Sequence, residues 1–206
     1  MQTQRQFDPA SEARYAQRIA RKKTLMDEKI AEADQDTGVL LILTGNGKGK
    51  SSSAFGMVAR ALGHGMKVGV VQFIKGRTDT GEEAFFAQHP NVTWHVMGDG
   101  FTWDTQNREA DTRSAQTGWT AAQAMLQDPS FDLVVLDELT YTITYKYLDG
   151  DMITRDLLAR PEMQHVVVTG RAASQGLLDI ADTITELQPT KHAFSAGIKA
   201  QKGVEW

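Results

Sequence analysis

The chain has 206 residues, 41% of them hydrophobic and 23% charged, which is typical of a globular protein that can bury a full apolar core. It has no cysteine, which excludes disulfides, thiolate nucleophiles and Cys-ligated metals and favours a cytoplasmic protein. The net charge of −4 argues against a nucleic-acid partner. No run of residues approaches the ~20 apolar residues of a membrane span, and the N-terminus has no apolar segment of a signal peptide. We therefore expect a protein that has no membrane partner and is not exported.

Residues 1–37 are predicted to be an N-terminal helical arm. Positions 1–36 carry seven basic and seven acidic side chains and few apolar ones. Tyr15, Ile19, Met26 and Ile30 recur at multiples of three and four, which places them in one narrow apolar stripe on a charged helix. Two interpretations remain open, a helix that lies on its own domain and one that reaches a second subunit.

Residues 38–206 are predicted to form one domain in which short apolar runs alternate with helical patterns. Several runs are apolar without alternation, as in parallel strands that are buried on both faces. The segments between them are long enough for crossover helices, notably about Lys50–Leu62 and Asn107–Gln127. After Pro189 we expect loop and short helix near the site. The predicted strands are Val39–Leu43, Lys67–Phe73, Val92–Met97, Phe131–Leu136, His165–Thr169 and Thr183–Leu187.

The segment that follows the first predicted strand matches a Walker A phosphate loop. Its glycines allow positive φ angles, so that backbone N–H groups and the start of the next helix converge on a polyphosphate. Thr44 stands where the usual pattern has glycine. A plain glycine-rich turn is the alternative, but it does not explain two lysines. The predicted nucleotide-binding residues are Gly45, Asn46, Gly47, Lys48, Gly49, Lys50 and Ser51, where Lys50 neutralises phosphate and the Ser51 hydroxyl binds Mg²⁺.

A second acidic signal ends the apolar run Leu133–Leu136. Asp137 and Glu138 follow it directly, where a Walker B carboxylate would complete the metal site. Helix capping is the alternative function of such a pair. The fold class that follows is α/β, a mostly parallel, doubly wound sheet of the P-loop NTPase (RecA-like) type with an N-terminal helical arm. Beside a phosphate loop, metal coordination by this pair is favoured over capping.

Other chemistry-bearing residues are less informative. The five histidines form no H-x-x-x-H pair, so a histidine metal site is not expected. Phe101 and Trp103 lie in a glycine-rich loop between a strand and a helix, where they either fill the core or form the wall of a pocket for a flat ligand. A strand-to-helix loop of a doubly wound sheet is expected at the carboxyl edge, which favours the pocket. Several arginines are candidates for phosphate contact, namely Arg60, Arg77, Arg108, Arg113 and Arg171.

Six stretches, in order, resemble the ATP:corrinoid adenosyltransferases that make adenosylcobalamin in bacteria. They are TGNGKGKS (44–51), VVQFIKG (70–76), GFTW (100–103), QNREAD (106–111), VVLDELTY (134–141) and KHAF (191–194). Thr44 in the phosphate loop belongs to the family pattern. The resemblance implies transfer of the 5′-deoxyadenosyl group of ATP to Co(I) of a corrinoid, such as cobalamin, cobinamide or cob(I)yrinic acid a,c-diamide, with release of triphosphate.

The resemblance also implies cofactors, partners and further site residues. MgATP (with Mg²⁺ or Mn²⁺) and a corrinoid are the substrates, a reduced flavoprotein is a suitable electron donor, and the arm closes the site of the other subunit in a homodimer. Phe101 and Trp103 match the loop that displaces the lower axial ligand of cobalt, and with Lys50 they are the implied catalytic residues. Ser51 and Glu138 are the implied metal ligands, with Asp137 behind Glu138. The alternatives are a P-loop ATPase or phosphotransferase and a nucleotide-dependent switch.

Overall fold

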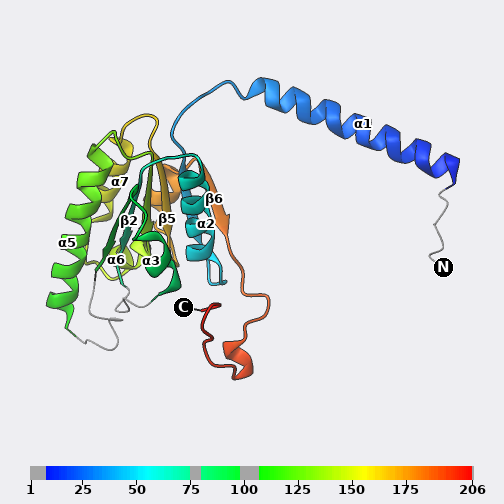
Figure 1. The fold of residues 1–206 in the computed structure, drawn as a ribbon. Helices are drawn as coiled ribbons and strands as arrows, with labels where there is room; N and C mark the ends of the chain where they lie inside the picture. Colours follow the sequence, from blue (N-terminus) through cyan, green and yellow to red (C-terminus); the bar gives the residue numbers. More distant parts are fainter. Residues whose placement is uncertain (1–7, 75–79, 98–106, 206) are drawn as a thin grey trace. The chain divides into compact units, whose positions relative to one another are not determined.

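The computed structural model describes residues 8–74, 80–97 and 107–205 (Figure 1). The chain divides into two compact units, residues 1–36 and residues 37–206. No helix in the described ranges is both long and apolar enough to cross a membrane.

The first unit contains one helix, α1 (Pro9–Glu32). The helix begins there because the Asp8 carboxylate accepts a hydrogen bond from the N–H of Ala10, and because a proline is favourable in the first helical turn. Within its own unit α1 buries none of its residues. The side chains of Tyr15 and Ile30, at the two ends of the apolar stripe, are 59% and 66% exposed. The predicted helix is confirmed, and its partner surface stays a prediction.

The second unit is built on a six-stranded sheet in the order β3-β2-β4-β5-β1-β6. All five strand pairings are parallel. The strand bounds lie within two residues of the predicted ones, which confirms the α/β class. The strands are β1 (Leu40–Thr44), β2 (Val68–Gln72), β3 (Val92–Val96), β4 (Leu133–Asp137), β5 (His165–Thr169) and β6 (Thr183–Glu186).

Successive residues of the inner strands point to opposite faces of the sheet, and helices cover both faces. In β4, Val134 and Leu136 belong to one buried cluster, whereas Leu133 and Val135 belong to the other. The first cluster is completed by α5 and α7, and the second by α2, so the sheet is doubly wound (Figure 1). The helices of this unit are α2 (Lys50–Gly63), α3 (Gly81–Phe86), α5 (Arg108–Gln127), α6 (Leu139–Thr144), α7 (Gly150–Leu158), α8 (Gln175–Asp179) and the 3₁₀ turn η1 (Phe194–Ala196).

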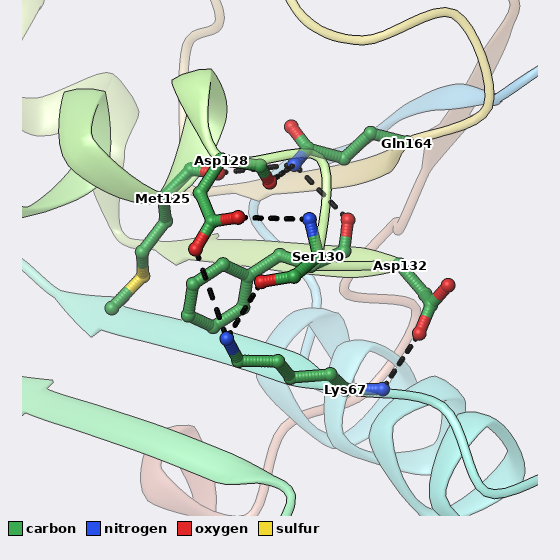
Figure 2. Close-up of polar contacts among 7 residues, drawn as sticks. Lys67, Met125, Asp128, Ser130, Asp132 and Gln164 are labelled. Carbon is green, nitrogen blue, oxygen red and sulfur yellow. Dashed lines mark hydrogen bonds and ion pairs between the residues drawn. The ribbon is translucent and has the colours of Figure 1, made fainter.

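Hydrogen bonds tie the loops together at the amino edge of the sheet (Figure 2). The buried amide of Gln164 donates through Nε2 to the carbonyl oxygens of Met125, Asp128 and Phe131, and so satisfies the end of α5. Lys67, which precedes β2, places its Nζ 4.1 Å from the centroid of the Phe131 ring and 3.7 Å from the Asp128 carboxylate. These contacts fix the loops at this edge, and the opposite edge carries the candidate site.

Candidate functional site

The candidate site lies at the carboxyl edge of the parallel sheet, where the ends of β1, β4 and β5 meet. A cavity of about 320 Å³ opens there. Ligands of open α/β sheets bind at this edge, because the loops after neighbouring strands converge on it. Of the predicted nucleotide-binding and metal residues, only Gly45 is not in the lining. The cavity is lined by Asn46, Gly47, Lys48, Gly49, Lys50, Ser51, Ser52, Glu82, Glu138, Tyr141, Thr169, Gly170, Arg171, His192, Val204 and Glu205.

Different structural constraints require glycine at different positions of the phosphate loop. Gly45 and Gly49 have φ angles of 94° and 107°, which side chains disfavour. Gly47 donates its N–H to the carbonyl of Leu187 at 2.7 Å, and a Cβ there would lie 2.8 Å from the same oxygen. A Cβ on Gly45 would approach that oxygen to 2.5 Å. The loop is therefore packed against the residues that follow β6. Gly45 permits this packing although it does not line the cavity.

The start of α2 completes the loop as an anion site. Gly49 is the residue before the helix, and Lys50 and Ser51 are its first two residues. The first N–H groups of a helix have no intrahelical partner and carry the positive end of the helix dipole. Because α2 is 14 residues long and follows a glycine loop, its N-terminus has the geometry in which proteins bind phosphate groups.

Lys50 lies among other positive charges inside the cavity. Its Nζ donates to the carbonyl of Gly47 at 2.6 Å. Burial lowers the pKa of Lys50, and the nearby charges of Arg171 and Lys48 lower it further, whereas Glu138 opposes the shift. An anion bound next to Lys50 would stabilise its charged form against this repulsion. Lys48, Lys50 and Arg171 thus give the cavity a positively charged region at the phosphate loop, beside the carboxylates of Glu82, Glu138 and Glu205.

The two carboxylates at the end of β4 have different environments. Asp137 is fully buried, and its two oxygens accept hydrogen bonds from Gln72 Nε2 at 2.9 Å and from Thr169 Oγ1 at 2.7 Å. The Thr169 hydroxyl oxygen in turn accepts the N–H of Glu138 at 2.9 Å. Glu138 lines the cavity and has a φ of 61°, in the left-handed region. Asp137 thus links the ends of β2, β4 and β5 by hydrogen bonds. Glu138, the residue after β4, is the carboxylate of the pair that lines the cavity.

The strained backbone of Glu138 is itself informative. A left-handed conformation costs a residue with a side chain about 1–2 kcal/mol, and such outliers gather at functional sites. Glu138 also begins α6 without a side-chain hydrogen bond to the helix. The capping interpretation of the Asp-Glu pair is therefore wrong for Glu138, and the metal interpretation stays a prediction.

Sequence reasoning could not separate the five arginines, and the structure places the four that it describes. Arg171, two residues after the end of β5, lines the cavity, and its carbonyl accepts a hydrogen bond from Thr140 Oγ1 at 2.7 Å. Arg60 lines a different cavity at the amino edge, and Arg108 and Arg113 lie on α5. Arg77 lies outside the described residues. The one signal that could have selected Arg171 is its place after a strand that borders β1.

The C-terminal tail also contributes to the cavity, as expected for loop and short helix near the site. His192, Val204 and Glu205 are in the lining, and the Glu205 carboxylate forms an ion pair with Lys48 Nζ. Phe101 and Trp103 lie outside the described residues. Their predicted role stays a prediction.

Comparison with known proteins identifies the family of the chain. Residues 36–206 match the family model described as ATP:corrinoid adenosyltransferase BtuR/CobO/CobP. The chain is 60% identical to the corrinoid adenosyltransferase of Pseudomonas aeruginosa, over 96% of this chain and 98% of that protein. It is 50% identical to corrinoid adenosyltransferase CobA of Salmonella typhimurium and 49% identical to the corrinoid adenosyltransferase of Escherichia coli K12, in each case over 95% of this chain and 100% of the relative. The chain belongs to the ATP:corrinoid adenosyltransferase family.

Proposed function

We propose that the protein transfers the 5′-deoxyadenosyl group of ATP to the Co(I) ion of a corrinoid and releases triphosphate. The observation that carries this proposal is the cavity in which Lys48, Lys50 and Arg171 gather around a glycine loop and a helix N-terminus. That arrangement suits an anion as highly charged as a triphosphate. Family membership supplies the corrinoid as the second substrate.

The reaction needs no general acid or general base from the protein. Co(I) is a strong nucleophile that attacks C5′ of ATP with its own electron pair, so a Co–C bond forms while the C5′–O bond breaks. Triphosphate departs with the electron pair of that bond. The protein must hold C5′ in line with cobalt and stabilise the developing negative charge. We assign this task to residues 46–50 and Arg171, which line the cavity.

A divalent cation fits the oxygen donors of the cavity. The Ser51 hydroxyl and the Glu138 carboxylate are hard ligands of the kind that Mg²⁺ and Mn²⁺ prefer, and both line the cavity. Among the described residues no three His, Asp or Glu side chains cluster as a metal cage. Phosphate oxygens and waters would therefore supply the remaining ligands, as is usual for Mg²⁺. The ion would add positive charge next to the leaving group.

The finer assignments complete the proposal. The acceptor is cob(I)yrinic acid a,c-diamide, cobinamide or cobalamin, and an electron donor such as a reduced flavoprotein supplies Co(I) in the cytoplasm. Phe101 and Trp103 press on the lower face of the corrin, so that cobalt loses its axial ligand before reduction. Residues 1–37 form an arm that serves the partner's site in a homodimer, and residues 38–206 form the catalytic domain. The resemblance supports these assignments.

Product analysis tests the proposed function against its alternatives. The protein is incubated with MgATP and chemically reduced cobalamin while the corrinoid absorption spectrum and the phosphate products are followed. Adenosyl transfer yields an alkylated corrinoid and triphosphate. ADP or orthophosphate with an unchanged corrinoid would indicate an ATPase or phosphotransferase. Tight nucleotide binding without turnover would indicate a switch.

A further inference from the structure

The C-terminal segment 201–205 reaches the mouth of the phosphate loop. Figure 1 shows the red end of the chain returning toward the ends of α2 and α3. The segment forms a turn in which the N–H groups of Val204 and Glu205 both donate to the carbonyl of Gln201, at 3.2 and 2.8 Å. Gly203 and Val204 also line a neighbouring cavity of about 360 Å³ with Phe85 of α3. The segment is therefore part of the wall between two cavities.

This turn brings a carboxylate into the anion site. Glu205 pairs with Lys48 Nζ, and its side chain is 19% exposed, against 47% for Lys48. Lys50 is satisfied differently, because its Nζ donates to the carbonyl of Gly47. Of the two loop lysines, Lys48 is thus the one that is neutralised by a carboxylate from the end of the chain.

Glu205 and a bound triphosphate would compete for the same charge. The carboxylate and the loop line one cavity, so a triphosphate in the loop would lie near a like charge. Like charges at short range repel, most strongly where water is partly excluded. The Lys48 ammonium also cannot keep its contact with Glu205 and at the same time turn its donors fully toward phosphate.

We propose that Glu205 is an internal competitor of the triphosphate: its carboxylate occupies Lys48 until ATP displaces segment 201–205, and it returns when triphosphate leaves. This inference rests on the proposed function, since it takes the loop to be the triphosphate site. The device weakens ATP binding, and it weakens binding of the triphosphate product in the same way. The weaker binding therefore favours release of the triphosphate product from the site.

Calorimetry of the full-length protein without corrinoid tests the proposal, with MgATP and inorganic tripolyphosphate as separate probes. Glu205→Gln removes the competing charge and keeps the size of the side chain. We expect both ligands to bind about two- to fivefold more tightly, as suits the loss of one partly exposed ion pair. The gain should shrink as salt rises, because salt screens the pair that the variant removes. Unchanged or weaker binding would overturn the proposal.

Two comparison variants make the result specific. Glu205→Asp keeps the charge, so its affinities should stay nearer to those of the unmodified protein than to those of Glu205→Gln. Asp128→Asn removes one negative charge that pairs with Lys67 at the opposite edge of the sheet, and it should leave both affinities unchanged. An equal gain in Asp128→Asn would mean that net charge, and not competition at Lys48, controls binding, and would contradict the proposal.

Hydrogen exchange gives a second readout that does not depend on turnover. Tripolyphosphate should speed exchange of the Val204 and Glu205 amides, because displacement of the segment breaks their bonds to Gln201. Slower exchange would show that the segment clamps onto the anion, which contradicts competition. If MgATP and tripolyphosphate both fail to bind the unmodified protein, the phosphate-loop assignment falls as well. If they bind and Glu205→Gln has no effect, only this inference falls.

Discussion

Glu138 offers a test that separates the strain of its backbone from the role of its charge. Its φ of 61° strains any residue that has a Cβ, by roughly 1–2 kcal/mol, and glycine removes that strain. Glycine loses about 0.5–1 kcal/mol more backbone entropy on folding, but it is the better residue of the two at the start of a helix such as α6. We therefore expect Glu138→Gly to be about 1 kcal/mol more stable than Glu138→Ala. For a protein of this length, that difference raises Tm by roughly 2–4 °C.

The two variants share the loss of the carboxylate, so their difference isolates the backbone. Calorimetric melting of Glu138→Gly and Glu138→Ala without nucleotide measures the strain. Adenosylation assays across a magnesium titration measure the role of the charge, with Glu138→Gln as the variant that keeps the shape. All three should lose activity and its dependence on Mg²⁺. Equal melting temperatures for the glycine and alanine variants would refute the strain argument. Full activity in Glu138→Gln would move the proposed metal role to Asp137.

Four further predictions concern the cavity, the arm and the aromatic loop. Lys50→Ala should abolish turnover and weaken MgATP binding by about 1.5–3 kcal/mol, measured by calorimetry, because a charge-assisted contact to phosphate is lost; unchanged affinity would contradict the phosphate-loop assignment. The lowered pKa of Lys50 means that its positive charge is lost at a lower pH than in an ordinary lysine, so ATP affinity should fall as pH rises through that pKa. Lys50→Arg, whose charge persists, should bind MgATP with a flatter alkaline profile. Deletion of residues 1–30 should leave residues 37–206 folded by circular dichroism, because α1 buries none of its own residues, and should raise KM or lower kcat; a truncation that does not fold would place the stripe in the core. Phe101→Ala and Trp103→Ala should impair the reaction from Co(II) cobalamin with a mild reductant and spare much of the reaction from preformed Co(I); equal losses in both assays would rule out a role in ligand displacement.

The sheet and the phosphate loop were predictable because their signals are local. Strands such as β4 and β5 are buried on both faces, so they read as unbroken apolar runs whose ends vary by only a residue or two. The loop at residues 45–49 is recognisable because its glycines meet a steric demand that the structure explains, namely positive φ angles and close approach to Leu187. The carboxyl end of β4 then follows from topology, since all parallel strands present that end at one edge.

The remaining site residues were not predictable because they are joined to the cavity only by the tertiary fold. Arg171 has no motif of its own, and its place depends on β5 pairing with β1. Glu205 lies 157 residues from Lys48 in the chain, and nothing in the sequence near either residue indicates that they meet. The left-handed backbone of Glu138 is likewise invisible in a sequence, since glutamate rarely adopts it. These contacts required the structure.

We propose that the cavity at the carboxyl edge delivers C5′ of ATP to cobalt and keeps the triphosphate until the Co–C bond has formed. A single turnover with ATP labelled with ¹³C at C5′ tests it directly, with preformed Co(I) cobalamin and equal amounts of protein and ATP. Carbon and phosphorus NMR should show the label on the corrinoid and one equivalent of triphosphate for each labelled corrinoid, with neither product in Lys50→Ala. Label that stays on ADP or free adenosine, or orthophosphate formed in place of triphosphate, would contradict adenosyl transfer at this cavity.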